Sequence, residues 1–481
     1  MSNLIAVTKP VLPLLFVLLS NTAGSRVLVR WTQDIVPSAK RLGVTELVVP
    51  WEPGRLPLFR IAVNQGYHVY AETGVREASA AADSAAKTGI AGVVVSPGDE
   101  PLSSLDDTIR RLRTTYPKVA FLLANPNAIQ PEMKGTLVIN RDGILQVTSP
   151  TAQPWVDTNL ALVRLEQAFR PAQVPLYSFR WNLTGAAQQQ GPDVPDYALA
   201  VAEAAAFGAD LILALHQNLE GGLAHDDSKA WATWDQVKQY VRFFPAQRRH
   251  LVPEANVAVI TAEDPASFEP INLLARHNIG VRVLKPNLFN EFNLQHFDVA
   301  VVLSTPTKTG MQTISHFAGR GGTVVLVNAN NVSYPWHSAR PLRTSNASVS
   351  YSIGKGRIIE LSEPIADPET FAQDVRRLIE NKDIRMSLWN ALTTIAVLYR
   401  GMDTGDKIVE LLNYAEDPLE VQIRVKGAYS SVRYETPEHD CCETLKPVIR
   451  DGFTEFLVPS VYIAGRVHLK GKVNPPTPAN K

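Results

Sequence analysis

The sequence predicts an α/β protein in which a (β/α)8-type barrel is followed by a smaller α/β domain and a C-terminal β-sandwich. Three observations lead to this prediction. Up to about residue 250, short apolar runs alternate with helical patterns. A second, more compact strand–helix alternation covers 256–329, and from about residue 386 strand follows strand with almost no helix between them.

The length and charge of the chain limit the number of domains and the kinds of partner that can be expected. It has 481 residues, of which 45% are hydrophobic and 20% charged. A globular chain of this length is expected to form about two to four domains. Lys+Arg and Asp+Glu both total 47, so the formal net charge is zero. A neutral chain offers no electrostatic footprint for nucleic acid or for an anionic membrane.

Residues 1–25 have the pattern of a signal peptide. Lys9 precedes the apolar run Val11–Leu19, which is too short to span a bilayer, and the small residues 23–25 follow it. The alternatives are a buried N-terminal strand or an uncleaved anchor. No other segment approaches ~20 consecutive apolar residues, so the mature protein is expected to be secreted or periplasmic and not held in a membrane.

The barrel is predicted over 26–250. Its strands are short runs rich in Val, Ile, Leu and Tyr, as buried parallel strands are. They are Val27–Trp31, Glu46–Trp51, Tyr67–Thr73, Gly92–Ser96, Val119–Ala124, Leu137–Ile139, Leu176–Trp181 and Leu211–His216, with helical patterns at Gln33–Leu42, Glu77–Lys87, Ser104–Thr115, Leu160–Phe169 and Asp196–Phe207. This period indicates about eight units, with a doubly wound open sheet as the alternative. The turn Asn140–Gly143 inside 135–149 indicates a β-hairpin inserted at the rim.

Polar and aromatic residues gather where these strands end, which is where barrel enzymes place their chemistry. Carboxylates, amides and indoles suit a sugar, since each hydroxyl needs a hydrogen-bond partner and the ring stacks on an indole. Paired carboxylates can act as acid and as nucleophile or base on a glycosidic bond. The predicted catalytic residues are Asp99, Glu100 and Glu220, and the predicted substrate-binding residues are Trp51, Glu72, Trp155, Asp157, Asn159, Arg180, Trp181, Asn182, His216 and Gln217.

Each of these residues also has a structural interpretation. Asp157 suits a helix cap, and Asp99 and Glu100 suit a solvated turn. Arg180 suits a structural ion pair, His216 suits a hydrogen-bonded core histidine, and the tryptophans suit rim packing. The prediction therefore depends on the accumulation of such residues at one rim.

No metal site and no cofactor are predicted. His216 and the run His225–Asp227 share one loop region, but the sequence contains no His-Glu-x-x-His and no Asp-x-Asp-x-Asp loop. Dinucleotide and Walker motifs are missing as well. The two cysteines, Cys441 and Cys442, cannot form a four-thiolate zinc site. Because a vicinal disulfide is strained, we expect two reduced or loosely paired thiols.

The rest of the chain is predicted to form an α/β domain over 252–383, a β-sandwich over 384–470 and a disordered tail over 471–481. This order of modules resembles the β-galactosidase family in which the barrel is followed by an amidotransferase-like trimerisation domain and a small β domain. The run Trp234–Phe244 is similar to the last barrel helix of such hydrolase-like proteins. The resemblance implies an α/β domain without glutaminase chemistry, in agreement with the absence of cysteine from it.

The resemblance also implies an acid/base Glu after the fourth strand, commonly in an Asn-Glu pair, and a nucleophile Glu after the seventh. The barrel half contains no Asn-Glu pair. Gly-Asp-Glu at 98–100 follows the fourth predicted strand, and Arg-Trp-Asn at 180–182 ends the seventh. Either the strand count is off by one, which makes Glu220 the nucleophile candidate, or the machinery has diverged or been lost.

The sequence therefore predicts an exported glycoside-hydrolase-like protein whose partner is a carbohydrate. Asp99 or Glu100 would donate the proton, and Glu220 would act as nucleophile or base. The alternative is a non-catalytic carbohydrate-binding or cell-surface protein on the same scaffold. The α/β domain would either form a homo-oligomer or brace the barrel.

Overall fold

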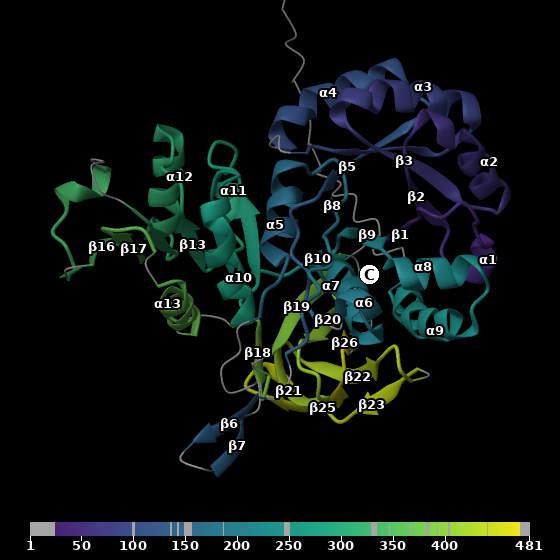
Figure 1. Cartoon of the computed structure of the whole chain (residues 1–481). Helices are drawn as coiled ribbons and strands as arrows, with labels where there is room; N and C mark the ends of the chain where they lie inside the picture. Colours follow the sequence, from purple (N-terminus) through teal and green to yellow (C-terminus); the bar gives the residue numbers. More distant parts are fainter. Residues whose placement is uncertain are drawn as a thin grey trace, which may run out of the picture.

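The computed structural model of the chain describes residues 25–98, 102–134, 137–141, 144–148, 156–185, 187–244, 251–328, 334–345, 347–365, 367–380, 384–391, 393–402, 405–439 and 441–471. Its three parts follow one another along the chain and contact one another in space (Figure 1). The barrel is purple to teal, the α/β domain teal to green, and the β-sandwich green to yellow.

A closed barrel of parallel strands forms the first part, as predicted. In the described chain the barrel strands are β1 (Val27–Arg30), β2 (Glu46–Pro50), β3 (His68–Gly74), β4 (Gly92–Ser96), β5 (Ala120–Asn125), β8 (Leu176–Tyr177) and β9 (Asp210–Ala214). Register pairs such as Arg30 with Val48 and Arg30 with Ala214 show β1 bonded to both β2 and β9, which closes the ring.

The sixth of the eight expected barrel strands lies elsewhere. Leu137–Ile139 belongs to β6 (Leu137–Arg141), which pairs antiparallel with β7 (Ile144–Thr148) in the predicted hairpin. This hairpin projects from the barrel beside the β-sandwich (Figure 1). The barrel of the described chain thus has one strand fewer than the sequence indicated.

Helices cover the outside of the barrel. They are α1 (Ala39–Leu42), α2 (Leu56–Asn64), α3 (Ala78–Thr88), α4 (Leu102–Thr115), α5 (Leu160–Phe169), α6 (Ala187–Gln190), α7 (Val194–Phe207), α8 (Gln217–Ala224) and α9 (Ser228–Phe243), with 3-10 turns η1 (Pro53–Arg55) and η2 (Val75–Glu77). Helix α7 shows why the sequence folds this way. Asp193 caps its first turn, and Gly208, with φ of 80°, ends it in a left-handed conformation that glycine adopts without strain.

The second part is a mixed α/β layer. Its sheet has the order β12 (Val281–Leu284), β11 (Val257–Ile260), β13 (Val299–Val302), β14 (Thr323–Leu326), β17 (Gly356–Leu361), β16 (Ser348–Ile353) and β15 (Arg343–Thr344). The accompanying helices are η4 (Pro265–Ser267), α10 (Phe268–Arg276), α11 (Glu291–Leu294), α12 (Lys308–Gly319), η5 (Pro335–Ser338) and α13 (Pro368–Glu380). The strands β11, β12, β13, β14 and β17 are parallel, and the other two add an antiparallel edge.

Two antiparallel sheets make the third part. One has the order β10 (Leu251–Pro253), β19 (Thr394–Gly401), β20 (Lys407–Asn413), β26 (Ala464–Gly471), β22 (Tyr429–Glu435) and β23 (Glu443–Leu445). The other has the order β18 (Met386–Trp389), β21 (Leu419–Lys426), β25 (Phe453–Val461) and β24 (Val448–Arg450). Buried residues from both sheets, such as Val409 and Ile423, share one core, as in a β-sandwich.

A single apolar cluster crosses the boundaries between the three parts. It includes Val29 of the barrel, Ile271 of the α/β layer and Ile463 of the β-sandwich. Helix α7 contributes to it along most of its length, and every residue from Tyr197 to Phe207 is buried. Among the described residues no helix is both long and apolar enough to cross a membrane.

Candidate functional site

The strands of a parallel barrel all end on the same side, and this end forms the candidate site. Alternate residues of each strand face the interior. Leu28, Val48, Tyr70, Val94, Ala124, Leu176 and Ile212 fill it with one apolar layer. Two residues further along their strands, Arg30 and Glu72 stand above that layer and reach the mouth of the barrel.

Arg30 and Glu72 form an ion pair at this mouth. The Arg30 Nε donates to Glu72 Oε2 at 2.6 Å. The side chains keep 41% and 16% of their surface exposed, so solvent reaches the pair but does not surround it. Glu72, predicted to bind substrate, is therefore a carboxylate in the barrel mouth with a fixed cationic partner.

Glu220 lies in the first turn of α8, directly after β9. Only 3% of it is exposed. The backbone N–H of Thr32 donates to Glu220 Oε1, and the Thr32 hydroxyl donates to Glu220 Oε2 at 2.7 Å. Since Thr32 follows β1, the end of one strand binds both oxygens of the carboxylate predicted to be the nucleophile.

Two of the predicted tryptophans lie near the mouth and are half-buried. The Trp181 indole N–H donates to the Ala214 carbonyl at 2.7 Å, and its ring meets Phe179 and Tyr197 edge-on at centroid distances of 4.8 and 5.0 Å. Trp51 follows β2, and its buried indole nitrogen has no hydrogen-bond partner among the described residues. Trp181 is thus held in a fixed position at the rim, whereas the Trp51 indole N–H has no partner in the described part of the chain.

The polar residues after β8 and β9 vary in exposure. His216 precedes α8, and its Nδ1 accepts a hydrogen bond from the Asn218 N–H at 3.4 Å. The His216 backbone N–H donates to the Tyr197 hydroxyl at 2.9 Å. Arg180, Asn182 and Gln217 are exposed. Solvent-exposed groups of this kind suit contact with a polar ligand, and their substrate-binding role remains a prediction.

Asp157 and Asn159 both have partners within the protein, although only Asn159 is buried. Asn159 is 3% exposed; it exchanges two hydrogen bonds with the Ile129 backbone and donates to Glu203 Oε1 at 2.6 Å. Asp157 lies 3.7 Å from Arg276 of α10, so it links the barrel to the α/β layer. The prediction that Asn159 binds substrate is not supported by this geometry, because its amide is fully used inside the protein.

Glu203 was missed by the sequence analysis. It is fully buried on α7, where its carboxylate accepts hydrogen bonds from Asn159, from Thr158 at 3.3 Å and from Tyr414 of the β-sandwich. Burial raises its pKa to about 7, while these hydrogen bonds lower it. The sequence did contain a signal, since Glu203 is the one charged residue in the apolar run 197–207.

The remaining predicted residues, Asp99, Glu100 and Trp155, lie outside the described residues.

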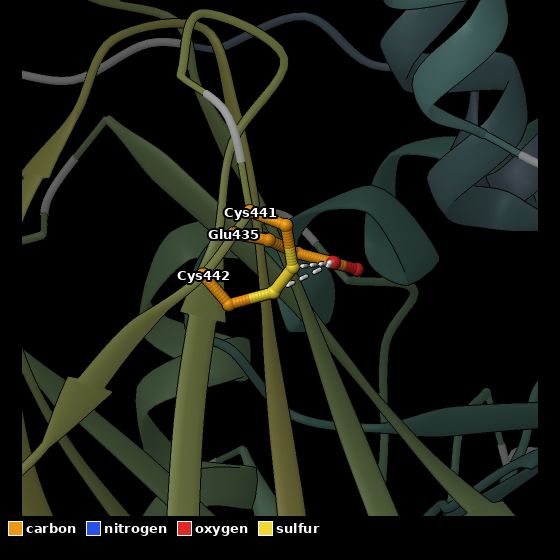
Figure 2. Close-up of side chains that lie close together, drawn as sticks. All are labelled: Glu435, Cys441 and Cys442. Atoms are coloured by element: carbon orange, nitrogen blue, oxygen red, sulfur yellow. Dashed lines mark hydrogen bonds between the residues drawn. A yellow bond between two sulfur atoms is a disulfide. The ribbon is translucent and has the colours of Figure 1, made fainter.

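One cluster of metal-ligand side chains appears in the described chain, at Glu435, Cys441 and Cys442 (Figure 2). The two cysteines form a disulfide, which corrects the expectation of reduced or loosely paired thiols. A disulfide supplies no thiolate. The Glu435 carboxylate accepts hydrogen bonds from His468 at 2.7 Å and Arg466 at 3.2 Å, and its pKa is lowered first by the His468 hydrogen bond. The cluster is therefore a polar contact of the β-sandwich.

Solved structures resemble the whole chain, although no protein-family model matches it and no curated protein matches it in sequence. An α-L-fucosidase isoenzyme 2 from Paenibacillus thiaminolyticus matches with a TM-score of 0.58 and 12% identity over 93% of this chain and 100% of that one. A β-galactosidase from Rahnella sp. R3 matches with a TM-score of 0.59 and 11% identity over 94% of this chain and 99% of that one.

These matches cover the barrel and the domains after it. The chain therefore has a multidomain fold with a glycoside-hydrolase-like barrel, as the order of modules indicated. A likeness at this identity is a likeness of fold, and function has to be argued from the site.

Proposed function

We propose that the protein is an exported glycoside hydrolase that cleaves a glycosidic bond with paired carboxylates at the barrel mouth. The observation that carries the proposal is the position of Glu72 and Glu220 on either side of the end of β1. Arg30 binds the first and Thr32 binds the second.

The separation of the Glu72 and Glu220 carboxyl groups decides which hydrolytic mechanism they could support. Catalytic carboxylates of glycosidases are separated by ~5–5.5 Å in retaining enzymes and ~6.5–9.5 Å in inverting ones. In this proposal Trp51 and Trp181 stack on sugar rings. Glu72 takes the role that the sequence predicted for Asp99 or Glu100, which are the alternative proton donors.

A second candidate function is carbohydrate binding without turnover. It is favoured by the internal partners of both carboxylates, because Glu220 is bonded to Thr32 through both oxygens and Glu72 is paired with Arg30. It also fits the absence of an Asn-Glu pair from the barrel half of the sequence.

Hydrolysis of a broad panel of glycans and aryl glycosides by the mature protein separates the two functions. We expect Glu72→Gln and Glu220→Gln to lower kcat by ~10²-fold or more, as loss of a general acid or base does. Asp99→Asn/Glu100→Gln tests the alternative donor. The control is Glu52→Gln, because Glu52 is an exposed carboxylate just after β2 and its loss should leave kcat unchanged.

The possible outcomes distinguish a hydrolase with other catalytic residues from a carbohydrate-binding protein. Activity that survives every substitution would retain a hydrolase but exclude these carboxylates. A protein that hydrolyses nothing on the panel but binds a glycan by calorimetry would be a carbohydrate-binding protein.

Export is proposed from the signal-peptide pattern of residues 1–25, but a contact of Ser25 supports cleavage before this residue and not after it. Ser25 is buried, and its hydroxyl donates to the Ala209 carbonyl at 2.6 Å. A cut after Ser25 would remove this contact, so we expect the mature chain to retain Ser25. The intact mass of the exported protein measures this, and a chain that starts at Arg26 or later would contradict it.

A further inference from the structure

An open cavity lies at the end of the barrel opposite the mouth. Its volume is about 320 Å³, and it is lined by parts of α5, β10, β12 and β19. Pro175, which directly precedes β8, and Gly208, which lies two residues before β9, also line it. These positions place the cavity at the N-terminal ends of the barrel strands, where all three parts of the protein meet (Figure 1).

The wall of this cavity is apolar and carries only positive charge. Its charged residues are Arg164, Arg282 and Lys285, and no aspartate or glutamate of the described chain is among its lining residues. Its apolar surface comes from side chains that include Ala168, Val174, Val252, Val283 and Leu288. Pockets that hold small molecules are mostly apolar, begin at ~300 Å³ and contain a few polar groups that orient the ligand.

Arg164 is the deepest of the three cations, with 5% of its surface exposed. Its Nη1 donates to Gln167 Oε1 at 2.8 Å and to the Phe207 carbonyl at 3.0 Å. Both acceptors are neutral, and no described carboxylate forms an ion pair with Arg164. Burial of a charge without a counter-ion is unfavourable. Arg170, just beyond the same helix, instead pairs with Glu263, Glu166 and Asp106.

Lys285 and Arg282 lie nearer to solvent than Arg164, and they too are cations without a described carboxylate partner. The Lys285 ammonium donates to the Phe169 carbonyl at 3.2 Å and lies 5.1 Å from the centre of the Phe169 ring. Arg282 is exposed, yet partial loss of solvent around its guanidinium lowers its pKa, and no described carboxylate raises it. In the part of the chain that the structure describes, the three cations around this apolar cavity therefore share the lack of an acidic partner.

We propose that this cavity binds a small amphipathic carboxylate, with the apolar body against the valine and leucine side chains and the carboxylate among Arg164, Arg282 and Lys285. Guanidinium groups form strong, directional hydrogen bonds with carboxylates, which supply the missing counter-charge. The site is distinct from the barrel mouth and independent of hydrolysis there.

Calorimetric titration of the whole mature protein with decanoate, below the concentration at which it forms micelles, tests the proposal. Decyltrimethylammonium has a similar chain with the opposite charge. We expect decanoate to bind at one site and the ammonium at least about tenfold more weakly, since a charge-assisted hydrogen bond contributes more than a tenfold change in affinity. Equal affinities, or no binding of decanoate, would overturn the proposal.

Variants locate the binding. Arg282→Gln/Lys285→Gln should weaken decanoate at least about tenfold, and Ala168→Phe should block it by filling the cavity. The control, Lys87→Gln, removes an exposed lysine of α3 and should change nothing. Decanoate binding that is unaffected by both cavity variants would place the ligand elsewhere and refute the site. Circular dichroism of each variant verifies that it is folded.

Discussion

Tyr414 of the β-sandwich donates a hydrogen bond to the buried carboxylate of Glu203 on barrel helix α7. Both residues are fully buried, and Thr158 lies within hydrogen-bond distance of both. Burial raises the pKa of Glu203 to about 7. The contact between barrel and β-sandwich therefore contains a group that changes charge near neutral pH.

Glu203→Gln should remove part of the pH dependence of stability. Because the pKa of Glu203 is higher in the folded chain, the folded state binds the proton more tightly than the unfolded state. Its contribution to the free energy of unfolding therefore falls as pH rises from about 4.5 to about 7. The shift corresponds to about 3 kcal/mol.

Urea unfolding of wild type and variant at pH 4.5 and pH 8 measures this effect. We expect the free energy of unfolding of the variant, relative to wild type, to be higher at pH 8 than at pH 4.5 by up to about 3 kcal/mol. For Glu52→Gln, which alters an exposed carboxylate, the free energy of unfolding relative to wild type should be the same at both pH values. A Glu203→Gln difference that does not depend on pH would contradict the assigned pKa.

Tyr414→Phe should destabilise the protein by about 1–3 kcal/mol, because it leaves a buried carboxylate with one donor fewer. Tyr399→Phe is the matched comparison: its hydroxyl also joins the β-sandwich to α7, but donates to the neutral Ala206 carbonyl at 2.6 Å. Near pH 8, where Glu203 is charged, chemical denaturation should show the larger loss for Tyr414→Phe. Equal losses would mean that the charge of Glu203 adds nothing to this contact.

Arg26 and Arg30, at the two ends of the first barrel strand, should differ strongly on replacement by methionine. Arg26 pairs with the buried Asp210 at 2.6 Å and with Glu46 at 3.0 Å. Burial raises the pKa of Asp210 to about 6, and Arg26 lowers it. Arg26→Met leaves a buried carboxylate uncompensated and should cost about 3–5 kcal/mol.

Arg30→Met removes a more exposed pair at the mouth and should cost about 1 kcal/mol or less. Thermal and urea unfolding of the two variants measure the contrast. Similar losses of stability in Arg26→Met and Arg30→Met would show that the barrel tolerates an unpaired Asp210.

Gly191→Ala should displace His216. Gly191 has a φ of 89°, and an added Cβ would lie 2.6 Å from His216 Nδ1. Gly185 has a φ of 60° but open space around it, so Gly185→Ala carries only the backbone strain of about 1–2 kcal/mol. We expect a greater loss of stability for Gly191→Ala and a changed imidazole NMR signal of His216. An unchanged signal would mean that His216 is positioned by other contacts.

The fold could be predicted from the sequence where buried segments have a clear apolar pattern. Buried parallel strands such as β2 and β4 are continuous apolar runs, and α5 has the bounds that its periodicity indicates. The sixth predicted strand was misplaced because an apolar run does not reveal its pairing partner. Leu137–Ile139 has the composition of a strand, but it pairs within a hairpin and not with the barrel.

The sequence indicated where the candidate site lies better than it indicated what each of its residues does. Strand ends identified Glu72, Trp181 and Glu220, because all parallel strands end at one rim. The sequence did not indicate the hydrogen bond of Asn159 with Glu203, because the two residues lie 44 positions apart along the chain. Such long-range partners leave no mark on local sequence.

The shared core around α7 has a consequence for the ancestry and engineering of this chain. Tyr197 to Phe207 are buried by the barrel on one side and by the β-sandwich on the other. A barrel cut out at residue 250 would present this apolar helix and its ionisable Glu203 to water. The three modules are successive in sequence, but the barrel and the β-sandwich share one apolar core, so we expect them to unfold together and to be inherited, exchanged or truncated only together.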